Sequence, residues 1–557
     1  MSRIPAAVIR SVNEAETTAT RVGALELPRP AALGELTWRL GVAALTIAVG
    51  AFVLIRLNGW PPHEDETLAL FTGRGSFHEL MDSVLGQRGG APLHFVLAWI
   101  VAHLGGGLLE LRLLSALFAI ASVPVLALLV RRLTDRVVAL VAVAMVAASW
   151  MLLFHAVYAR MYSLFLFTSA LSYLALLNAL ERRDRRRWAL WTIAVFACVA
   201  THPYGALVLG SQGLYVLYLR RWREALPAFG AVAVLGIPFW RADLVLGGRF
   251  DVGVGGGGVK LGGLDSIGRY FVRVAGDFTA GWSIVRIVVV LVFCAGFVLL
   301  ARERRSSAAL SACAIVTPAF FFLALRVRSG LASPESRHLI FVLPFFATCL
   351  ALPLVRLSRR HRVGVPALAV VVLGLAALEL AWGYHRTPLL YEGEQSRRVE
   401  ARQAASEWLA DTGRSDDVLF GYDPLFLGAW EREHDVSGTV APRADAKLAL
   451  NVLDDAPKPL GRGVWVLDAS DRNNFAPRLT IPLRYPRGAS RFEVRTFGPF
   501  LVVRSREPTG TVREFLLQGQ AVQHLGQDLM LGDPDINLFT IERGLGLRSL
   551  AAAGGPR

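Results

Sequence analysis

The sequence predicts a polytopic α-helical membrane protein of about eleven transmembrane helices followed by a small external α/β domain. The chain has 557 residues, of which 54% are hydrophobic and only 18% are charged. Its mean hydropathy is positive, which is too apolar for a soluble protein. Apolar runs of about 17 to 25 residues predict membrane spans. We assign them to residues 40–57, 111–131, 137–153, 162–180, 188–200, 205–219, 225–241, 283–300, 308–325, 338–354 and 363–383.

The arginines between these runs predict the orientation. The net charge is +15, and the basic residues cluster in short loops, as in the cytoplasmic loops of membrane proteins, so no nucleic-acid partner is implied. The run 92–104 is too short to span and is expected to lie in the interface. Residues 1–38 then form a disordered cytoplasmic tail, residues 39–383 the transmembrane domain, and residues 384–557 an external domain. The cysteines lie within predicted spans and imply no disulfide or zinc site: Cys198, Cys294, Cys313 and Cys349.

The first external loop, 58–110, contains the acidic stretch 63–67, which reads His-Glu-Asp-Glu-Thr. Carboxylates beside a membrane are costly to desolvate, so they are expected at the aqueous interface or in a wet cavity. A solvated loop and a catalytic site both fit this pattern. Ser76 and Glu79 then form a capping box before an amphipathic segment, which predicts a short helix lying on the membrane.

Two further segments carry weaker signals. The external loop 242–282 is glycine-rich, but Lys260 is followed by Leu-Gly, so the lysine and hydroxyl pattern of a phosphate-binding loop is absent. A lid and a disordered loop fit it equally. The tripeptide 533–535, Asp-Pro-Asp, matches a metal-binding pattern of nucleotide-sugar enzymes and is read as structural. In the external domain, segments 417–420, 463–467 and 499–503 predict strands, and 403–409 predicts a helix.

The sequence resembles the bacterial GT-C glycosyltransferases, which are similar to protein O-mannosyltransferases and the lipid A aminoarabinose transferase. The resemblance covers residues 40 to about 350. It rests on an ordered set of motifs: Asp65-Glu66, Ala91-Pro92-Leu93, Leu111-Arg112-Leu113-Leu114-Ser115, Ala159-Arg160-Met161-Tyr162-Ser163, Thr201-His202-Pro203-Tyr204-Gly205 and Arg337-His338-Leu339-Ile340-Phe341. It implies transfer of a sugar from a polyprenyl-phosphate donor to an acceptor outside the membrane.

Three positions depart from the bacterial pattern. Tyr158 stands where a glutamate usually precedes the arginine motif, Ala91 replaces a proline, and His338 replaces a tyrosine. These changes leave the fold expectation intact, but they leave open which acceptor is used and whether a metal takes part.

Sugar transfer from a lipid phosphate requires a base for the acceptor hydroxyl and cations or hydrogen-bond donors for the phosphate. We assign Asp65 as the base and expect Glu64 and Glu66 to raise its proton affinity as like charges. Glu66 is expected to orient the acceptor or, alternatively, to hold a divalent cation, although no cofactor is required. Donor binding is assigned to Arg160, Tyr162, His202, Tyr204, Arg337 and His338. The alternatives are headgroup anchoring for the arginines and turn or capping roles for the histidines.

The predicted function is therefore an inverting transfer of a mannose- or arabinose-like sugar to a glycan, lipid or protein acceptor. The setting is a bacterial cytoplasmic membrane, because the abundance of Ala, Arg, Gly and Val suggests a GC-rich bacterium. Two other classes remain: a lipid or glycolipid transporter, which would be expected to show internal repeats and midspan charges, and a membrane-anchored scaffold or receptor with an external binding domain. A cavity opening at Asp65 would favour the transferase.

Overall fold

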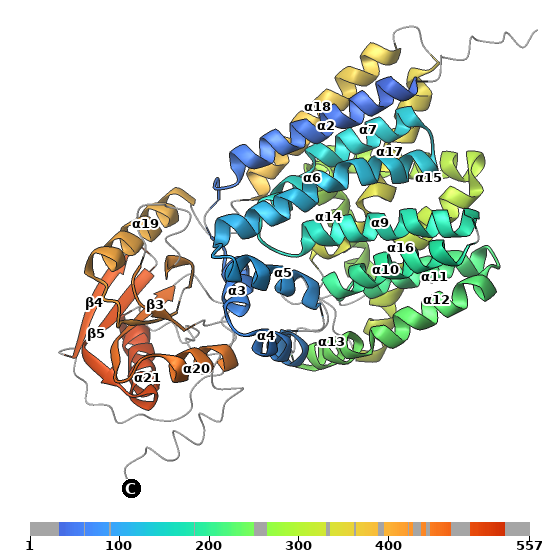
Figure 1. Ribbon diagram of the computed structural model, residues 1–557. Helices are drawn as coiled ribbons and strands as arrows, with labels where there is room; N and C mark the ends of the chain where they lie inside the picture. Colours follow the sequence, from blue (N-terminus) through green and yellow to red (C-terminus); the bar gives the residue numbers. More distant parts are fainter. Residues whose placement is uncertain are drawn as a thin grey trace, which may run out of the picture.

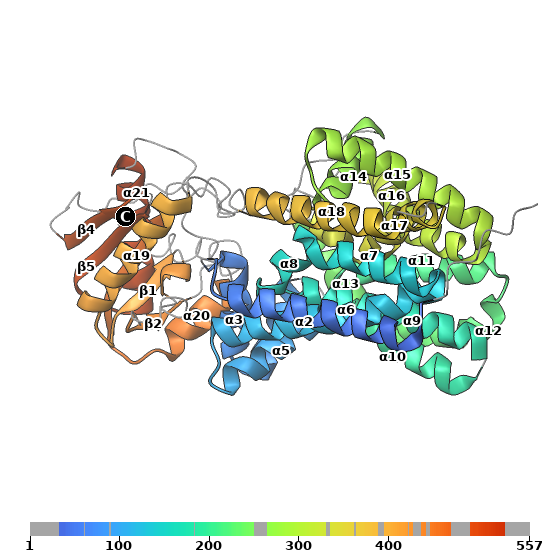
Figure 2. The same cartoon turned by 90° about the horizontal axis from the view of Figure 1, so that it is seen from above.

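The computed structural model shows a long bundle of helices with a small sheet domain at one end (Figures 1 and 2). It describes residues 33–60, 62–88, 91–182, 184–249, 264–329, 335–360, 364–387, 395–421, 423–426, 436–441, 446–468, 491–498 and 500–529. The expectations for residues 1–32, for the glycines of 253–258 and for the tripeptide 533–535 lie outside these ranges.

The bundle is built from long apolar helices joined by short connections. The first half comprises α2 (Glu35–Arg56), α3 (Glu64–Arg74), α4 (Phe77–Ser83), the π-helical turn η1 (Val84–Arg88), α5 (Pro92–His103), α6 (Leu108–Leu133), α7 (Arg136–Ala148), α8 (Trp150–Ala156) and α9 (Tyr162–Arg182). The second half comprises α10 (Arg185–Thr201), α11 (Gly205–Tyr218), α12 (Trp222–Leu235), α13 (Ile237–Arg249), α14 (Leu264–Phe278), α15 (Ser283–Glu303), α16 (Arg305–Ser329), the 3-10 helix η2 (Ser336–Val342), α17 (Leu343–Ser358) and α18 (Gly364–Arg386).

Every predicted apolar run coincides with a helix or a bent pair of helices, so the protein is a multi-pass membrane protein as expected. In the described part of the chain, seven helices are long and apolar enough to cross a membrane. The number rises to nine if the bent pairs α7 with α8 and α12 with α13 each count as one span. The predicted runs 188–200 and 205–219 fall on α10 and α11, which have 17 and 14 residues. The count of eleven remains a prediction.

Helices α3, α4 and α5 form a compact layer at the end of the bundle that faces the sheet domain (Figure 1). The predicted capping box is present, since Ser76 Oγ accepts from Glu79 N at 3.2 Å and Glu79 accepts from Ser76 N at 2.8 Å. Helix α5 has 12 residues, consistent with a helix that does not span. Gly73 lets α3 approach α5, because a Cβ there would lie 2.9 Å from the backbone carbonyl of Ala98.

The small domain has the predicted α/β character. Its elements are α19 (Gln395–Thr412), β1 (Val418–Gly421), η4 (Asp423–Phe426), β2 (Thr439–Val440), α20 (Ala446–Asp455), β3 (Leu460–Asp468), β4 (Phe492–Phe497), β5 (Phe500–Gly510) and α21 (Val512–Leu529). The strand order is β2-β1-β3-β5-β4, with β1 parallel to β2 and β3, and β5 antiparallel to β3 and β4. One face packs on α20 and α21 and the other on α19 and η4.

This domain contacts the short helices at the end of the bundle. Arg402 on α19 donates from Nη1 to the carbonyl oxygen of Pro62 at 3.4 Å, and Asn451 on α20 donates to Glu79 Oε1 at 2.8 Å. Pro62 directly precedes the acidic stretch. The domain therefore lies beside the candidate site.

Candidate functional site

The acidic stretch is the first turn of helix α3 and not the loop that sequence reasoning allowed. His63 is the N-cap: its Nδ1 accepts from the backbone N–H of Asp65 at 3.1 Å, and its own N–H donates to Glu66 Oε2 at 2.9 Å. Histidine is not among the usual N-cap residues, so the signal was easy to miss. Acidic residues at a helix N-terminus are favoured by the helix dipole.

Glu66 is fully buried in a two-pronged ion pair. Arg112 on α6 donates from Nε to Glu66 Oε1 at 2.9 Å and from Nη2 to Oε2 at 2.7 Å. The backbone N–H of Ala159 adds a third donor at 2.8 Å, and His63 N is the fourth. A buried ion pair is tolerated when such hydrogen bonds satisfy it. Glu66 therefore joins α3, α6 and the segment before α9, and this geometry differs from the expected contact with an acceptor or a cation.

The side chain of Asp65, unlike that of Glu66, is 32% exposed. Its Oδ2 accepts from the hydroxyl of Tyr158 at 2.9 Å and lies 3.7 Å from Arg337 Nη2. Arg160 Nη1 donates to the backbone oxygen of Asp65 at 3.1 Å. This carboxylate is thus open to solvent on one side and held by cations and a phenol on the other.

The pKa of Asp65 lies well below its ordinary value. Burial alone would raise it, but Arg160, then His63 and Arg337, and the hydrogen bond from Tyr158 outweigh burial. The expectation that Glu66 raises this pKa is wrong, and the side chain of Glu64 lies outside the described residues. Glu66 is paired with Arg112, and the charges of Arg160 and Arg337 lower the pKa of Asp65.

The other residues predicted to bind the donor form a cluster of aromatic and imidazole rings beside Arg337; they are Tyr162, His202, Tyr204 and His338. Arg337 Cζ lies 5.1 Å from the ring centroid of Tyr162. The ring centroids of His202 and His338 are 5.4 Å apart, and those of Tyr204 and His338 are 5.0 Å apart. Tyr162 lies 5.7 Å from His202. Segments that are far apart in sequence therefore converge on one cluster, as the motifs implied.

Both histidines also have local structural roles. His202 Nδ1 accepts from Tyr204 N at 3.0 Å, and His338 Nδ1 accepts from Glu335 N at 3.1 Å. The neutral ring then carries its proton on Nε2, which leaves a donor. Burial, followed by the charges of Arg160 and Arg337, lowers the pKa of His202 to about 3, so this imidazole is neutral at physiological pH.

Several residues of the cluster were not selected from the sequence. Tyr158 was noted only as a departure from the family pattern, and Arg112 only as part of a motif. His155 on α8 lies with its ring centroid 4.8 Å from that of Tyr162. Buried polar atoms without a partner in the described residues include both ring nitrogens of His155, the hydroxyl of Tyr204 and Nε of Arg160. Buried polar groups usually have a hydrogen-bond partner, so these atoms have donor and acceptor capacity that a bound molecule or water can use.

Within the described ranges, no group of three or more His, Cys, Asp or Glu side chains is placed to hold a metal ion. The carboxylate that was considered for this role, Glu66, already accepts from Arg112 through both oxygens.

The protein has the GT-C glycosyltransferase fold. The family described as dolichyl-phosphate-mannose-protein mannosyltransferase matches residues 89–239. The structure is similar to that of ArnT from Cupriavidus metallidurans bound to undecaprenyl phosphate, with a TM-score of 0.55 and 14% identity over 85% of this chain and 98% of that chain. The apo ArnT structure gives a TM-score of 0.52 at 14% identity, over 84% and 97% of the two chains. A mycobacterial arabinofuranosyltransferase, AftD, is a weaker match, with a TM-score of 0.43, 15% identity and coverage of 85% and 40%.

No curated protein matches the sequence of this chain. The fold similarity and the family match confirm the predicted fold class and resemblance. They support a membrane glycosyltransferase as the class of protein.

Proposed function

We propose that the protein transfers a mannose- or arabinose-like sugar from a polyprenyl-phosphate donor to an acceptor hydroxyl on the outer side of a bacterial cytoplasmic membrane. The observation that carries the proposal is the partly exposed carboxylate of Asp65 beside Arg160 and Arg337. A GT-C fold similar to that of an ArnT crystallised with undecaprenyl phosphate supports a lipid-phosphate donor.

The donor phosphate would be bound by the two arginines. A guanidinium binds phosphate in a bidentate fashion, and Nε of Arg160 is a buried donor without a partner among the described residues. Tyr204 and the imidazoles of His202 and His338 supply further donors for the phosphate or sugar. Tyr162 packs under Arg337 and orients its guanidinium.

Asp65 would act as the base. The acceptor oxygen attacks the anomeric carbon, the bond from that carbon to the phosphate oxygen breaks, and the lipid phosphate leaves with the bonding electrons. The acceptor proton passes to Asp65. Attack from the face opposite the phosphate inverts the anomeric centre. A carboxylate with a low pKa is a weak base, so it would take the proton late, after attack has made the hydroxyl acidic.

A bound phosphate would also compete with Asp65 for Arg337. That competition would weaken the attraction between Arg337 and the Asp65 carboxylate. The pKa of Asp65 would then rise, which makes it a better proton acceptor when the donor is present. Glu66 is assigned a positioning role, because its side chain holds Arg112 and the N–H of Ala159 and thereby fixes Asp65 next to Tyr158.

The small domain is proposed to be external and to help select a glycan, lipid or protein acceptor, because it contacts Pro62 and Glu79 beside the site. The orientation can be tested with single cysteines at Asp184 and Asp454 after replacement of the native cysteines. In intact cells an impermeant thiol reagent is expected to label position 454 and not position 184. The reverse pattern would place the site in the cytoplasm.

The activity is tested by incubating membranes that contain the protein with a panel of radiolabelled polyprenyl-phosphate sugars and extracting lipid and polymer fractions. Transfer from one donor is expected, and it should disappear with Asp65→Asn. The anomeric configuration of the product reports inversion. If no lipid-phosphate sugar is consumed, while a labelled lipid moves across the membrane in vesicles that contain the protein, the transporter alternative replaces this proposal.

A further inference from the structure

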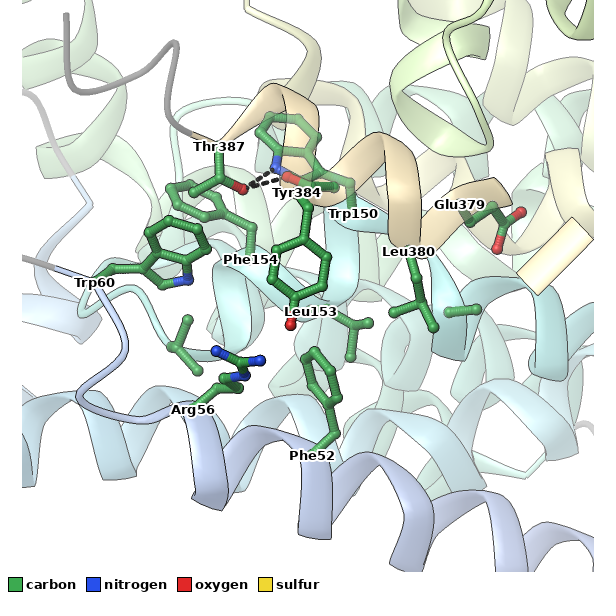
Figure 3. Close-up of a pocket in the computed structure, with 13 residues that line it drawn as sticks. Phe52, Arg56, Trp60, Trp150, Leu153, Phe154, Glu379, Leu380, Tyr384 and Thr387 are labelled. Carbon is green, nitrogen blue, oxygen red and sulfur yellow. Dashed lines mark hydrogen bonds between the residues drawn. The ribbon is translucent and has the colours of Figure 1, made fainter. Parts of the chain in front are cut away.

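A second pocket lies between helices α2 and α18 (Figure 3). Both helices pack on α7 and α8 rather than closely on each other. The gap between them is a pocket whose empty volume, including the open solvent at its mouth, is about 410 Å³. Most of its wall is apolar and aromatic, including Phe52, Trp60, Leu153, Phe154 and Leu380. Such a lining fits a hydrocarbon chain.

The pocket is separate from the proposed catalytic cluster but shares a wall with it. The ring of Phe154 lines the pocket and stacks on Tyr158 with centroids 5.2 Å apart. Only 28% of the apolar window of α2 and 11% of that of α18 are buried, so the two helices that flank the pocket present most of their surface to lipid.

The outer end of the pocket carries a cation. Arg56 ends α2, and its Cζ lies 5.3 Å from the ring centroid of Tyr384 on α18. Figure 3 shows both side chains at the pocket. Among the described residues no carboxylate lies within ion-pair distance of Arg56, so its charge is available to an anionic headgroup at the membrane surface.

A buried carboxyl group lies deeper along the same pocket. Glu379 on α18 is 1% exposed, and neither of its oxygens has a hydrogen-bond partner within the described residues. At the ~1.5 Å rise per residue of a helix it lies roughly 7.5 Å further along the axis than Tyr384. An ionisable group inside a span is costly and calls for a partner.

The depth of Glu379 distinguishes between kinds of lipid. A polyprenyl chain is hydrocarbon throughout and would leave this group unsatisfied. A lipid with ester linkages has carbonyl oxygens below its phosphate, and a neutral carboxyl group can donate to one of them. We propose that the α2–α18 pocket binds one acyl chain of an ester-linked anionic phospholipid, with the phosphate at Arg56 and an ester carbonyl at Glu379. This site goes beyond the proposed transfer reaction.

The test is a titration of the purified full-length protein in detergent with palmitoyl-oleoyl phosphatidylglycerol, followed by native mass spectrometry. Gly383 lines the pocket, and a Cβ there would meet Trp150 only at ordinary contact distance, 3.5 Å. Gly383→Leu should therefore fill the pocket without a backbone clash and weaken the tightest binding at least about tenfold. Gly374→Leu on the same helix is the matched control, since a Cβ at Gly374 meets nothing within 4 Å, and it should bind like the wild type.

Two further variants test the chemistry without filling the pocket. Arg56→Gln changes an exposed side chain and should weaken binding about fivefold, the scale of one cation near a phosphate, and bring it close to that of phosphatidylcholine with the same chains. Glu379→Leu should reduce the preference for phosphatidylglycerol over undecaprenyl phosphate. Equal binding by the Gly383→Leu and Gly374→Leu variants would overturn the site. Tighter wild-type binding of undecaprenyl phosphate that Gly383→Leu abolishes would overturn the choice of lipid. Neither readout depends on sugar transfer.

Discussion

The two ends of the helical bundle both contain arginines and carboxylates, but they differ in how many of the arginine donors are paired. At the end that holds the start of α2 and the end of α17, three arginines each pair with a carboxylate from another part of the bundle. Arg136 contacts Glu35 at 2.5 Å, Arg359 contacts Asp135 at 3.1 Å, and Arg356 contacts Glu303 at 2.5 Å. These side chains are roughly a quarter to a third exposed. Their role is fully explained by joining neighbouring helices at the membrane surface.

At the end that holds Asp65, Arg112 is paired with Glu66, and Arg337 Nε lies 2.6 Å from Glu335 Oε2, whereas no carboxylate of the described residues lies within ion-pair distance of Arg160. Arg337 Nη2 lies 3.7 Å from Asp65, and Arg160 donates to a backbone oxygen of that residue rather than to its carboxylate. Buried donors remain on Arg160 and Tyr204. Cationic residues at span ends are therefore insufficient evidence for a site. Surplus hydrogen-bonding capacity next to an open carboxylate is the feature that indicates a ligand.

The largest expected effect is on the carboxylate. Asp65→Asn keeps the shape and removes the proton acceptor, so turnover should fall by roughly 10²–10⁴ while donor binding survives. Glu303→Gln at the opposite end removes a charge of the same sign and should leave transfer unchanged. Initial rates with the lipid-phosphate sugar measure both. Near-normal turnover in Asp65→Asn would contradict the role of base.

The buried pair should control stability rather than chemistry. Arg112→Ala leaves Glu66 charged and unpaired inside the protein, which should cost about 3–5 kcal/mol of folding free energy. Arg356→Ala at the opposite end breaks a partly exposed pair with Glu303 and should cost only about 0–1 kcal/mol. Denaturant or thermal unfolding in detergent compares them. Equal losses of folding free energy would show that the buried pair is not more important for stability than the partly exposed pair.

The donor arginines should affect transition-state binding. Arg160→Ala and Arg337→Ala should each lose on the order of 2–3 kcal/mol in kcat/KM, the scale of a charge-assisted hydrogen bond. Lysine should restore little, because it lacks the planar fork. Arg359→Ala is the control from the opposite end. Normal donor use by well-folded alanine variants would make both residues membrane anchors only.

The smallest expected effect concerns pH. Since the neighbouring cations hold the pKa of Asp65 below its ordinary range, the carboxylate is already ionised at neutral pH. Its contribution to stability is present above the unfolded pKa of about 3.9 and is lost as pH falls through the lower folded value. Asp65 should therefore produce no acid limb in kcat/KM between about pH 8 and pH 5. A limb near pH 6 to 7 that vanishes in Asp65→Asn would show that the pKa is raised instead.

Local patterns account for much of what was predicted correctly. Apolar runs located the helices of the bundle, because the membrane demands long apolar segments. The pair Ser76 and Glu79 predicted a helix start, since a capping box involves neighbours in sequence. The motif residues Arg160, His202 and Arg337 were chosen through a family resemblance, and the structure brings them together.

Other features depended on contacts between distant segments. The two adjacent acids look equivalent in sequence, yet Glu66 meets Arg112 on another helix and Asp65 meets Tyr158, so one is buried and the other open. The sign of the pKa shift of Asp65 followed from these contacts and not from its sequence neighbours. The α2–α18 pocket is likewise formed by helices far apart in the chain.

The apolar runs and the strand and helix patterns of the sequence were enough to predict a multi-pass membrane protein with a small α/β domain, because hydrophobicity and periodicity are local properties of the chain. Which carboxylate is exposed, and which buried polar groups lack partners among the described residues, became visible only in the folded structure. Burial, charge pairing and hydrogen bonding are set by neighbours in space, and in a helical bundle those neighbours come from remote parts of the chain.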